Sequence, residues 1–312
     1  MQRKSARIGC VKKNCCIFAI QTNKTSIMST MISLANQMAP MTNEEVKTVC
    51  PYAFAEDPTN PAVSGKYVHA NTATVISDME KLGWYPVEAK QCRPKKNSKG
   101  IRSFHMVVME SNDVKTNIVG RDGNVEAKVR IIIQNSHDGF NSFRFMMGVY
   151  RFVCSNGMVV ADAQFADFSI RHINYSFEEL RGIVAKVMDN VPTTIKKMNQ
   201  MNITMLNDEQ KRAMAVETYK IRKGYAAEDD ITVDDQTVED LLTPVRTEDE
   251  GNSLWNVFNV LQEKMIKGSF MAPGKNGKAR KQRAITSIKK DLDYNERLWA
   301  VAEQYIPLQV AA

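Results

Sequence analysis

The sequence predicts an α+β fold: a largely antiparallel sheet with flanking helices, followed by a helical C-terminal part. Three observations support this fold class. Residues 129–160 read as apolar strands joined by two turns rich in Asn, Ser and Gly. Helix-capping signals at Thr42 and Ser176 precede apolar segments with helical spacing. Helical spacing of apolar residues returns after residue 253.

The first elements are two short helices and a strand. Thr42, followed three residues later by Glu, predicts a helix over 42–50, since a proline comes next. A second predicted helix begins at residue 71 or 72 and ends at Gly83. A strand over 84–91 follows it directly.

A basic loop separates this strand from the next one, predicted at 103–110. Together they predict a β-hairpin with a cationic tip. The basic residues of the loop are Arg93, Lys95, Lys96, Lys99 and Arg102.

Two specified turns organise the strands that follow. Strands at 129–134 and 142–154 are joined by Asn135–Gly139, whose final glycine is free to adopt positive φ. The Ser-Asn-Gly of 155–157 is a second hairpin turn, and alternating residues at 165–172 predict one more strand.

Helices dominate the rest of the chain. One begins at Ser176 and should kink or break at Pro192, and another runs from Asn207 to about Gly224. These elements complete a predicted α+β core domain over 42–224. Residues 226–250 are rich in Asp and Glu, so we expect 225–252 to be a solvated acidic linker in which a short helix at 238–242 can still form. A helical C-terminal subdomain over 253–312 carries amphipathic helices at 253–266 and 295–305.

The net charge of +7 is concentrated at the N-terminus, since residues 1–27 hold six basic residues and no acid, which leaves +1 for the remainder. We expect residues 1–40 to be a disordered basic leader, or an upstream extension from a misassigned start. The apolar run 15–20 is too short for a secretory signal. We therefore expect the protein to act in the cytoplasm of the host cell.

The six cysteines are scattered, with no C-x-x-C pair and no histidine at zinc spacing. We therefore expect no disulfide framework, no metal site and no cofactor.

The most enzyme-like residues are His137 and the adjacent Asp138, and a histidine could serve as a general base. The alternatives are that these residues lock a turn, or that they contact a ligand or nucleic acid. The wider candidate ligand or motif site comprises Asn135, His137, Asp138, Arg144, Arg151 and Asn156. Arg144 and Arg151 lie an odd number of residues apart, which places them on opposite faces of one strand unless a bulge intervenes.

A second basic segment, 264–290, contains no acid. Flexible cationic loops of this kind are typical of phosphate contacts, although the segment could instead balance the acidic stretch. Its candidate nucleic-acid-binding residues are Lys275, Lys278, Arg280, Lys281, Arg283, Lys289 and Lys290.

Several segments in order resemble one known family. They are CPYAFAED, LGWYPVEAKQ, NSHDG, RFVCSNG, LWNVFNVLQEKMIKG and NERLW, and the resemblance leaves out only residues 1–40. The sequence resembles the phage/plasmid-like protein family, a domain of unknown function that phages and plasmids carry. The resemblance implies a mobile-element context and no particular reaction.

Three functional hypotheses follow. The first is a DNA-metabolism protein that binds or anneals single-stranded nucleic acid without cutting it, since phage annealing recombinases also combine hairpin sheets with a long helix. The second is an enzyme centred on His137, Asp138 and Arg151. The third is a host-interaction or counter-defence factor that binds a protein through its acidic segment. Single-stranded DNA is the favoured partner, with no membrane partner, and a homo-oligomer is an open alternative.

Overall fold

The computed structural model describes residues 39–60, 63, 69–93, 96–97, 100–114, 127–151, 157–159, 169–170, 175–274 and 276–307 of the 312-residue chain. The chain divides into two compact units, Met1–Ala39 and Pro40–Ala312. The described helices and strands belong to the second unit. The predicted leader falls almost entirely outside the described residues, and the predicted linker lies within the second unit.

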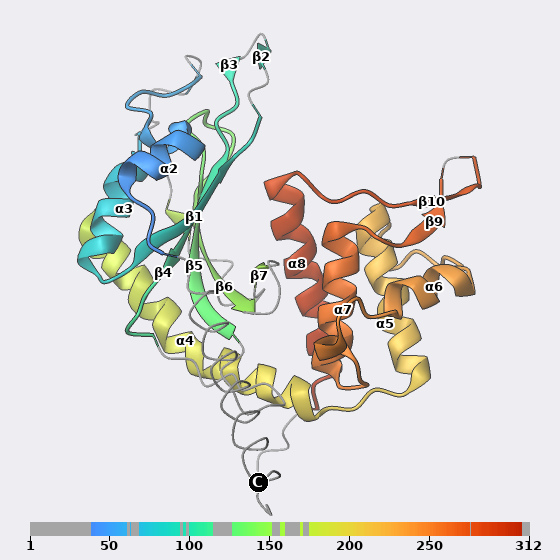
Figure 1. Ribbon diagram of the computed structural model, residues 1–312. Helices are drawn as coiled ribbons and strands as arrows, with labels where there is room; N and C mark the ends of the chain where they lie inside the picture. Colours follow the sequence, from blue (N-terminus) through green and yellow to red (C-terminus); the bar gives the residue numbers. More distant parts are fainter. Residues whose placement is uncertain are drawn as a thin grey trace, which may run out of the picture. The chain divides into compact units, whose positions relative to one another are not determined.

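The second unit contains a mixed arrangement of helices around one main sheet (Figure 1). The strand order is β1-β4-β5-β6-β7, and β8 also pairs with β6. All pairings between these described strands are antiparallel. The strands are β1 (Tyr85–Gln91), β4 (His105–Glu110), β5 (Ala127–Asn135), β6 (Phe143–Arg151), β7 (Gly157–Val159) and β8 (Ser169–Ile170). The predicted α+β class is confirmed.

The first two predicted hairpins are present. β1 pairs with β4, and the short strands β2 (Lys96–Asn97) and β3 (Gly100–Ile101) pair with each other in the connection between them. β5 and β6 are joined by the predicted turn, in which Gly139 has φ 76°. A Cβ at Gly139 would also lie 2.9 Å from Cγ1 of Val63, so both backbone conformation and space require glycine there.

Two further predictions concern segments that the structure describes only in part. β7 pairs with β6, but the Ser-Asn-Gly turn before it lies outside the described residues, apart from Gly157 at the start of β7. Of the strand predicted at 165–172, only β8 is described.

The N-terminal helices confirm their capping signals. Helix α2 (Asn43–Val49) begins with a complete capping box between Thr42 and Glu45. Helix α3 (Thr72–Lys81) is capped by the Asn71 side chain, which accepts a hydrogen bond from the Ala73 backbone. A turn of 3₁₀ helix, Pro51–Phe54, follows α2.

Of the two alternatives predicted at Pro192, a kink or a break, the break does not occur, because helix α4 (Phe177–Ile203) continues through the proline. Proline removes one backbone hydrogen bond from a helix interior. On either side of it, however, Val191 and Thr194 are buried in the stripe that packs against the core. This packing holds the helix together across the proline.

The C-terminal part is helical, with one small hairpin. Its elements are α5 (Asp208–Lys223), α6 (Asp235–Leu242), α7 (Leu254–Lys267), β9 (Met271–Pro273), β10 (Ala279–Lys281) and α8 (Ile288–Glu303). Helix α8 begins earlier than the predicted residue 295 because Ser287 caps it and Leu292 is buried. The short helix considered near 238–242 is α6, and Val238 and Leu241 bury its apolar side.

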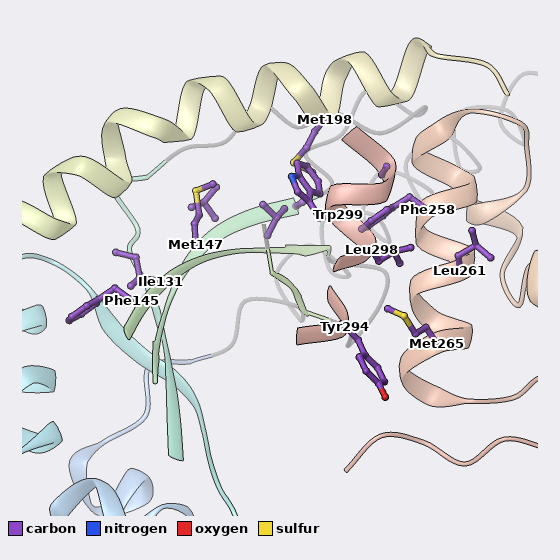
Figure 2. Close-up of a cluster of buried hydrophobic side chains, with 14 of the residues drawn as sticks. Ile131, Phe145, Met147, Met198, Phe258, Leu261, Met265, Tyr294, Leu298 and Trp299 are labelled. Atoms are coloured by element: carbon purple, nitrogen blue, oxygen red, sulfur yellow. The ribbon is translucent and has the colours of Figure 1, made fainter. Parts of the chain in front are cut away.

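The two faces of the sheet contribute to two separate apolar clusters. On one face, Ile131, Phe145 and Met147 belong to the main core, which continues along α4 to Trp299 of α8 (Figure 2). On the other face, α8 contributes Leu292 to a second cluster. The sheet residues of that cluster are Val87, Met106, Val108, Ile132, Met146 and Tyr150. Among the described helices, none has the length and apolar content needed to cross a membrane.

Candidate nucleic-acid interface and a buried histidine cluster

The turn between β5 and β6 is held by the side chain of Asp138, which is almost completely buried. One carboxylate oxygen, Oδ1, accepts hydrogen bonds from Ser136 Oγ at 2.7 Å and from the Phe140 backbone N–H at 3.0 Å. The other, Oδ2, accepts from the backbone N–H of Ser103 at 3.2 Å. The Asn60 side chain donates to the Asp138 carbonyl at 3.0 Å. Asp138 therefore joins its own turn to the segment that leads into β4.

Three of the chain's four histidines gather beside this turn. The ring of His137 lies 4.4 Å from that of His69 and 5.0 Å from that of His105, measured between centroids. His105 and His137 are fully buried. Within the described part of the chain, no group of His, Cys, Asp or Glu has an arrangement that could hold a metal ion.

The hydrogen bonds of His105 fit a neutral ring in one tautomer. Its Nδ1 lies 2.6 Å from the carbonyl oxygen of Ser103, which can only accept, so Nδ1 carries the proton. Its Nε2 then accepts from Thr72 Oγ1 at 2.8 Å, and that hydroxyl accepts from Asn135 Nδ2 at 2.9 Å. This chain of contacts fixes the end of β5 to the first residue of α3.

The structure brings together Asn135, His137 and Asp138 from the candidate ligand site but not the arginines. Arg144 faces α8, where its guanidinium lies 3.9 Å from Glu296. Arg151 pairs with Ala127 at the opposite end of the β5–β6 hairpin from the turn, roughly 27 Å along the strand. The side chain of Arg151 and all of Asn156 lie outside the described residues. The register of the hairpin thus places Arg151 far from His137 and Asp138, the other two residues of the catalytic hypothesis.

The sequence did not single out Ser103, Thr72, His69 or His105 as members of this cluster. They come from two segments that are distant from the turn in the chain, and the sheet register and the position of α3 bring them to the turn. The periodic pattern of apolar residues predicts helices and strands, but it cannot predict which distant residues come into contact. The one available signal was the concentration of histidines in segments next to predicted turns.

The cationic hairpin is described at its two ends. Arg93 and Arg102 are exposed, and the Arg102 guanidinium lies over the Phe140 ring, 5.9 Å from its centroid. For Lys96 only the backbone is described, and Lys95 and Lys99 fall outside the described residues.

A second group of cations surrounds the β9–β10 hairpin and the start of α8. We call it the C-terminal basic surface, and it comprises Lys278, Arg280, Lys281, Arg283, Lys289 and Lys290. All six residues are exposed, and none forms an ion pair with another described residue. Lys275 lies outside the described residues.

Neighbouring lysines outside this surface are neutralised or buried, which sets them apart. Lys267 pairs with Glu263 at 3.0 Å. Lys264 is buried, and this burial lowers the pKa of its amine. In this described part of the chain, the exposed cations without an ion pair are therefore those of the C-terminal basic surface.

Contacts with helix α5 and with Gly268 hold the chain segment that carries the C-terminal basic surface. Arg222 donates to the carbonyl of Arg283, and Lys223 donates to Gln282 Oε1 at 3.1 Å. Burial, followed by the nearby Arg222, lowers the pKa of Lys223. A Cβ at Gly268 would lie 2.3 Å from the Gln282 carbonyl oxygen, so the two chain segments approach as closely as glycine allows.

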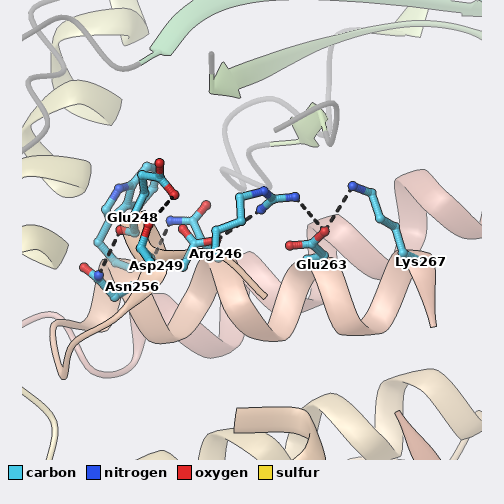
Figure 3. A network of polar contacts seen from close by, with 9 residues as sticks. Arg246, Glu248, Asp249, Asn256, Glu263 and Lys267 are labelled. Atoms are coloured by element: carbon cyan, nitrogen blue, oxygen red, sulfur yellow. Dashed lines mark hydrogen bonds and ion pairs between the residues drawn. The ribbon is translucent and has the colours of Figure 1, made fainter. Parts of the chain in front are cut away.

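The acidic stretch 226–250 directs several of its charges inward. Arg246 pairs with the buried Asp249 at 3.1 Å and with Glu263 of α7 at 2.6 Å, and Lys267 shares the same Glu263 carboxylate (Figure 3). Asp240 of α6 accepts a hydrogen bond from the Met271 backbone of β9 at 2.9 Å. These acids hold the helices and the hairpin in place and leave the C-terminal basic surface unpaired.

Comparison with known proteins identifies relatives over most of the chain. A family model described as "Domain of unknown function (DUF932)" matches residues 61–299. Two proteins of Escherichia coli (strain K12), UPF0380 protein YafZ and UPF0380 protein YfjQ, are each 28% identical over 273 residues, which cover 87% of this chain and 93% of each relative. No solved structure matches the chain significantly. The chain belongs to the DUF932 family.

Proposed function

We propose that this protein binds single-stranded nucleic acid without cutting it, as a DNA-metabolism protein of a phage or plasmid that acts in the host cytoplasm. The observation that carries the proposal is the C-terminal basic surface, whose six exposed cations have no acidic partner among the described residues. A phosphate backbone supplies the missing anions, and the release of its condensed counterions supplies the free energy of binding.

The framework beneath this surface suits such a role. The β9–β10 hairpin is fixed to α5 through Lys223 and to α6 through Asp240. A cationic surface on an anchored hairpin loses less conformational entropy on binding than one on a free tail. Arg93 and Arg102 of the cationic hairpin offer further phosphate contacts.

The catalytic alternative has less support from the geometry. His137 is fully buried and Asp138 nearly so, and both oxygens of Asp138 accept hydrogen bonds from its own turn and from Ser103. A general base must come within hydrogen-bonding distance of a substrate proton. The arrangement fits the alternative in which these residues lock the turn.

The proposal is tested by fluorescence anisotropy with labelled single-stranded and duplex DNA across a salt series. We expect tight binding to the single strand at low salt and an affinity that falls steeply as salt rises. Binding that does not depend on salt, or no binding at low salt, rejects the proposal. In that case the acidic stretch 226–250 becomes the surface to test for a protein partner.

A further inference from the structure

Phe140 is the most exposed aromatic side chain of the described residues, at 55%. It directly follows the NSHDG turn, whose polar residues are buried. The backbone N–H of Phe140 donates to the buried carboxylate of Asp138, which holds the backbone that carries this exposed side chain in one place. The exposure is therefore a property of a rigid site and not of a loose loop.

Arg102 completes the arrangement from another part of the chain. Its guanidinium lies 5.9 Å from the centroid of the Phe140 ring, within the range of a cation–π contact. The next residue, Ser103, donates its backbone N–H to Asp138 Oδ2, while Phe140 donates to Oδ1. A single buried carboxylate thus sets the positions of both the aromatic ring and the arginine.

We propose that Phe140 and Arg102 form a stacking platform for one unpaired nucleobase, and that the buried NSHDG network serves to hold this platform rigid. The inference rests on the proposed binding of single-stranded nucleic acid and adds the element that recognises an unpaired base. The base stacks on the Phe140 ring, and Arg102 contacts the adjacent phosphate. A duplex cannot use the platform, because its bases are already stacked within the helix.

The position of the platform supports this assignment. Arg93 and Arg102 are exposed at the two ends of the cationic hairpin, so the ring lies beside positive charge. Tyr85, also exposed at 39%, begins β1 and pairs with Glu110, at the opposite end of the sheet. Within the described residues, no cation lies over the Tyr85 ring. Tyr85 therefore serves as a matched control for an exposed aromatic side chain.

The test compares the Phe140→Ala, Phe140→Trp and Tyr85→Ala variants of the full chain. Loss of one stacked base should weaken binding to single-stranded DNA by roughly 5- to 100-fold. The Phe140→Ala variant should show this loss with an unchanged salt dependence, because phenylalanine contacts no phosphate. Phe140→Trp should restore binding, and Tyr85→Ala should bind as the wild type does.

A second readout locates the base directly. Irradiation of the wild-type protein with an oligonucleotide that contains 5-iododeoxyuridine should cross-link the peptide that carries Phe140, as mapped by mass spectrometry. If Phe140→Ala binds single strands normally, or loses single-strand and duplex affinity equally, the platform is refuted while the proposed function stands. If the wild-type protein binds no nucleic acid at low salt, the proposed function fails and the platform with it.

Discussion

At the scale of single residues, Asp138 is the side chain whose hydrogen bonds hold the candidate platform together. Its two oxygens accept from three donors in two segments, and the contacts with Ser103 and Ser136 are buried. A buried donor that loses its acceptor costs more free energy than the bond itself contributes, since nothing replaces the acceptor. The turn therefore depends on this one carboxylate.

We predict that Asp138→Ala lowers the free energy of unfolding by about 2–4 kcal/mol, because three donors lose their acceptor. Urea denaturation monitored by circular dichroism measures the change. Asp113→Ala is the matched control, since Asp113 is exposed and its side chain has no hydrogen bond among the described contacts. Equal stability of the two variants would contradict the role assigned to Asp138.

The sequence revealed part of this cluster. The turn motif identified Asn135, His137 and Asp138, because turn chemistry is local in the chain. The contacts with Ser103 and Thr72 depend on the register of β4 against β5 and on the position of α3. Register and helix docking are set by packing of the whole sheet, so no local pattern contains them.

At the scale of elements, the β5–β6 turn and helix α4 each contain a glycine, and replacing each by alanine tests whether the backbone there requires glycine. Gly139 has φ 76° and has Val63 within 2.9 Å of its missing Cβ, whereas Gly182 in α4 has open space around that position. We predict that Gly139→Ala lowers the free energy of unfolding by about 1–3 kcal/mol, since alanine is strained at positive φ.

The same substitution in the helix should have the opposite sign. Gly182→Ala should raise the free energy of unfolding by about 0.5–1 kcal/mol, because alanine loses less backbone entropy in a helix. Thermal and chemical denaturation of both variants measure the difference. A stabilising effect of Gly139→Ala would show that the turn does not require glycine.

Helix α8 carries a partly buried carboxylate, Glu296, near Arg144 of the sheet. Burial raises the pKa of Glu296 above its ordinary value of 4.5, the nearby Arg144 opposes this shift, and Asp293 adds to it. An acid whose pKa is higher in the folded state favours folding when it is protonated. Its contribution is therefore greatest below about pH 4.5 and is lost as the pH rises through the folded-state pKa.

We predict that Glu296→Gln flattens the pH dependence of stability between the ordinary pKa of glutamate and neutrality. At neutral pH the variant should be at least as stable as the wild type, since the glutamine carries no charge to desolvate. Urea titrations of both proteins across this pH window provide the measurement. A wild-type stability that rises with pH relative to the variant would reverse the assigned sign.

The helices begin at the capping residues that the sequence analysis identified. Thr42, Ser176 and Asn207 each begin a helix where the sequence predicted one. Helix α8 was predicted to begin too late, because its first turn, after Ser287, is rich in lysine and its apolar side emerges only against the sheet. The continuity of α4 through Pro192 has a related reason, since tertiary packing outweighed a local signal for a break.

At the scale of the whole described unit, the two kinds of charge are used differently. Acids such as Asp240, Asp249 and Glu263 are engaged in internal contacts that hold α6, α7 and β9 together. The C-terminal basic surface has no comparable internal partners among the described residues. The sequence located this surface, because a run without acids is visible in the chain, but not the anchoring of its hairpin, which depends on contacts with α5 and α6.

The most direct test of this account is the salt dependence of single-strand binding after charge reversal. The variant changes Lys278, Arg280, Lys281 and Arg283 to glutamate, and the control makes the same charge change at Lys47, Arg181, Lys186 and Lys196, which are exposed on α2 and α4. The affinity falls as salt rises, and each phosphate contact steepens this fall by about 0.7 log units of affinity per log unit of salt. Loss of four contacts should therefore make the variant's slope shallower by about 3. The control should keep the wild-type slope, and equal slopes in all three proteins would contradict the account.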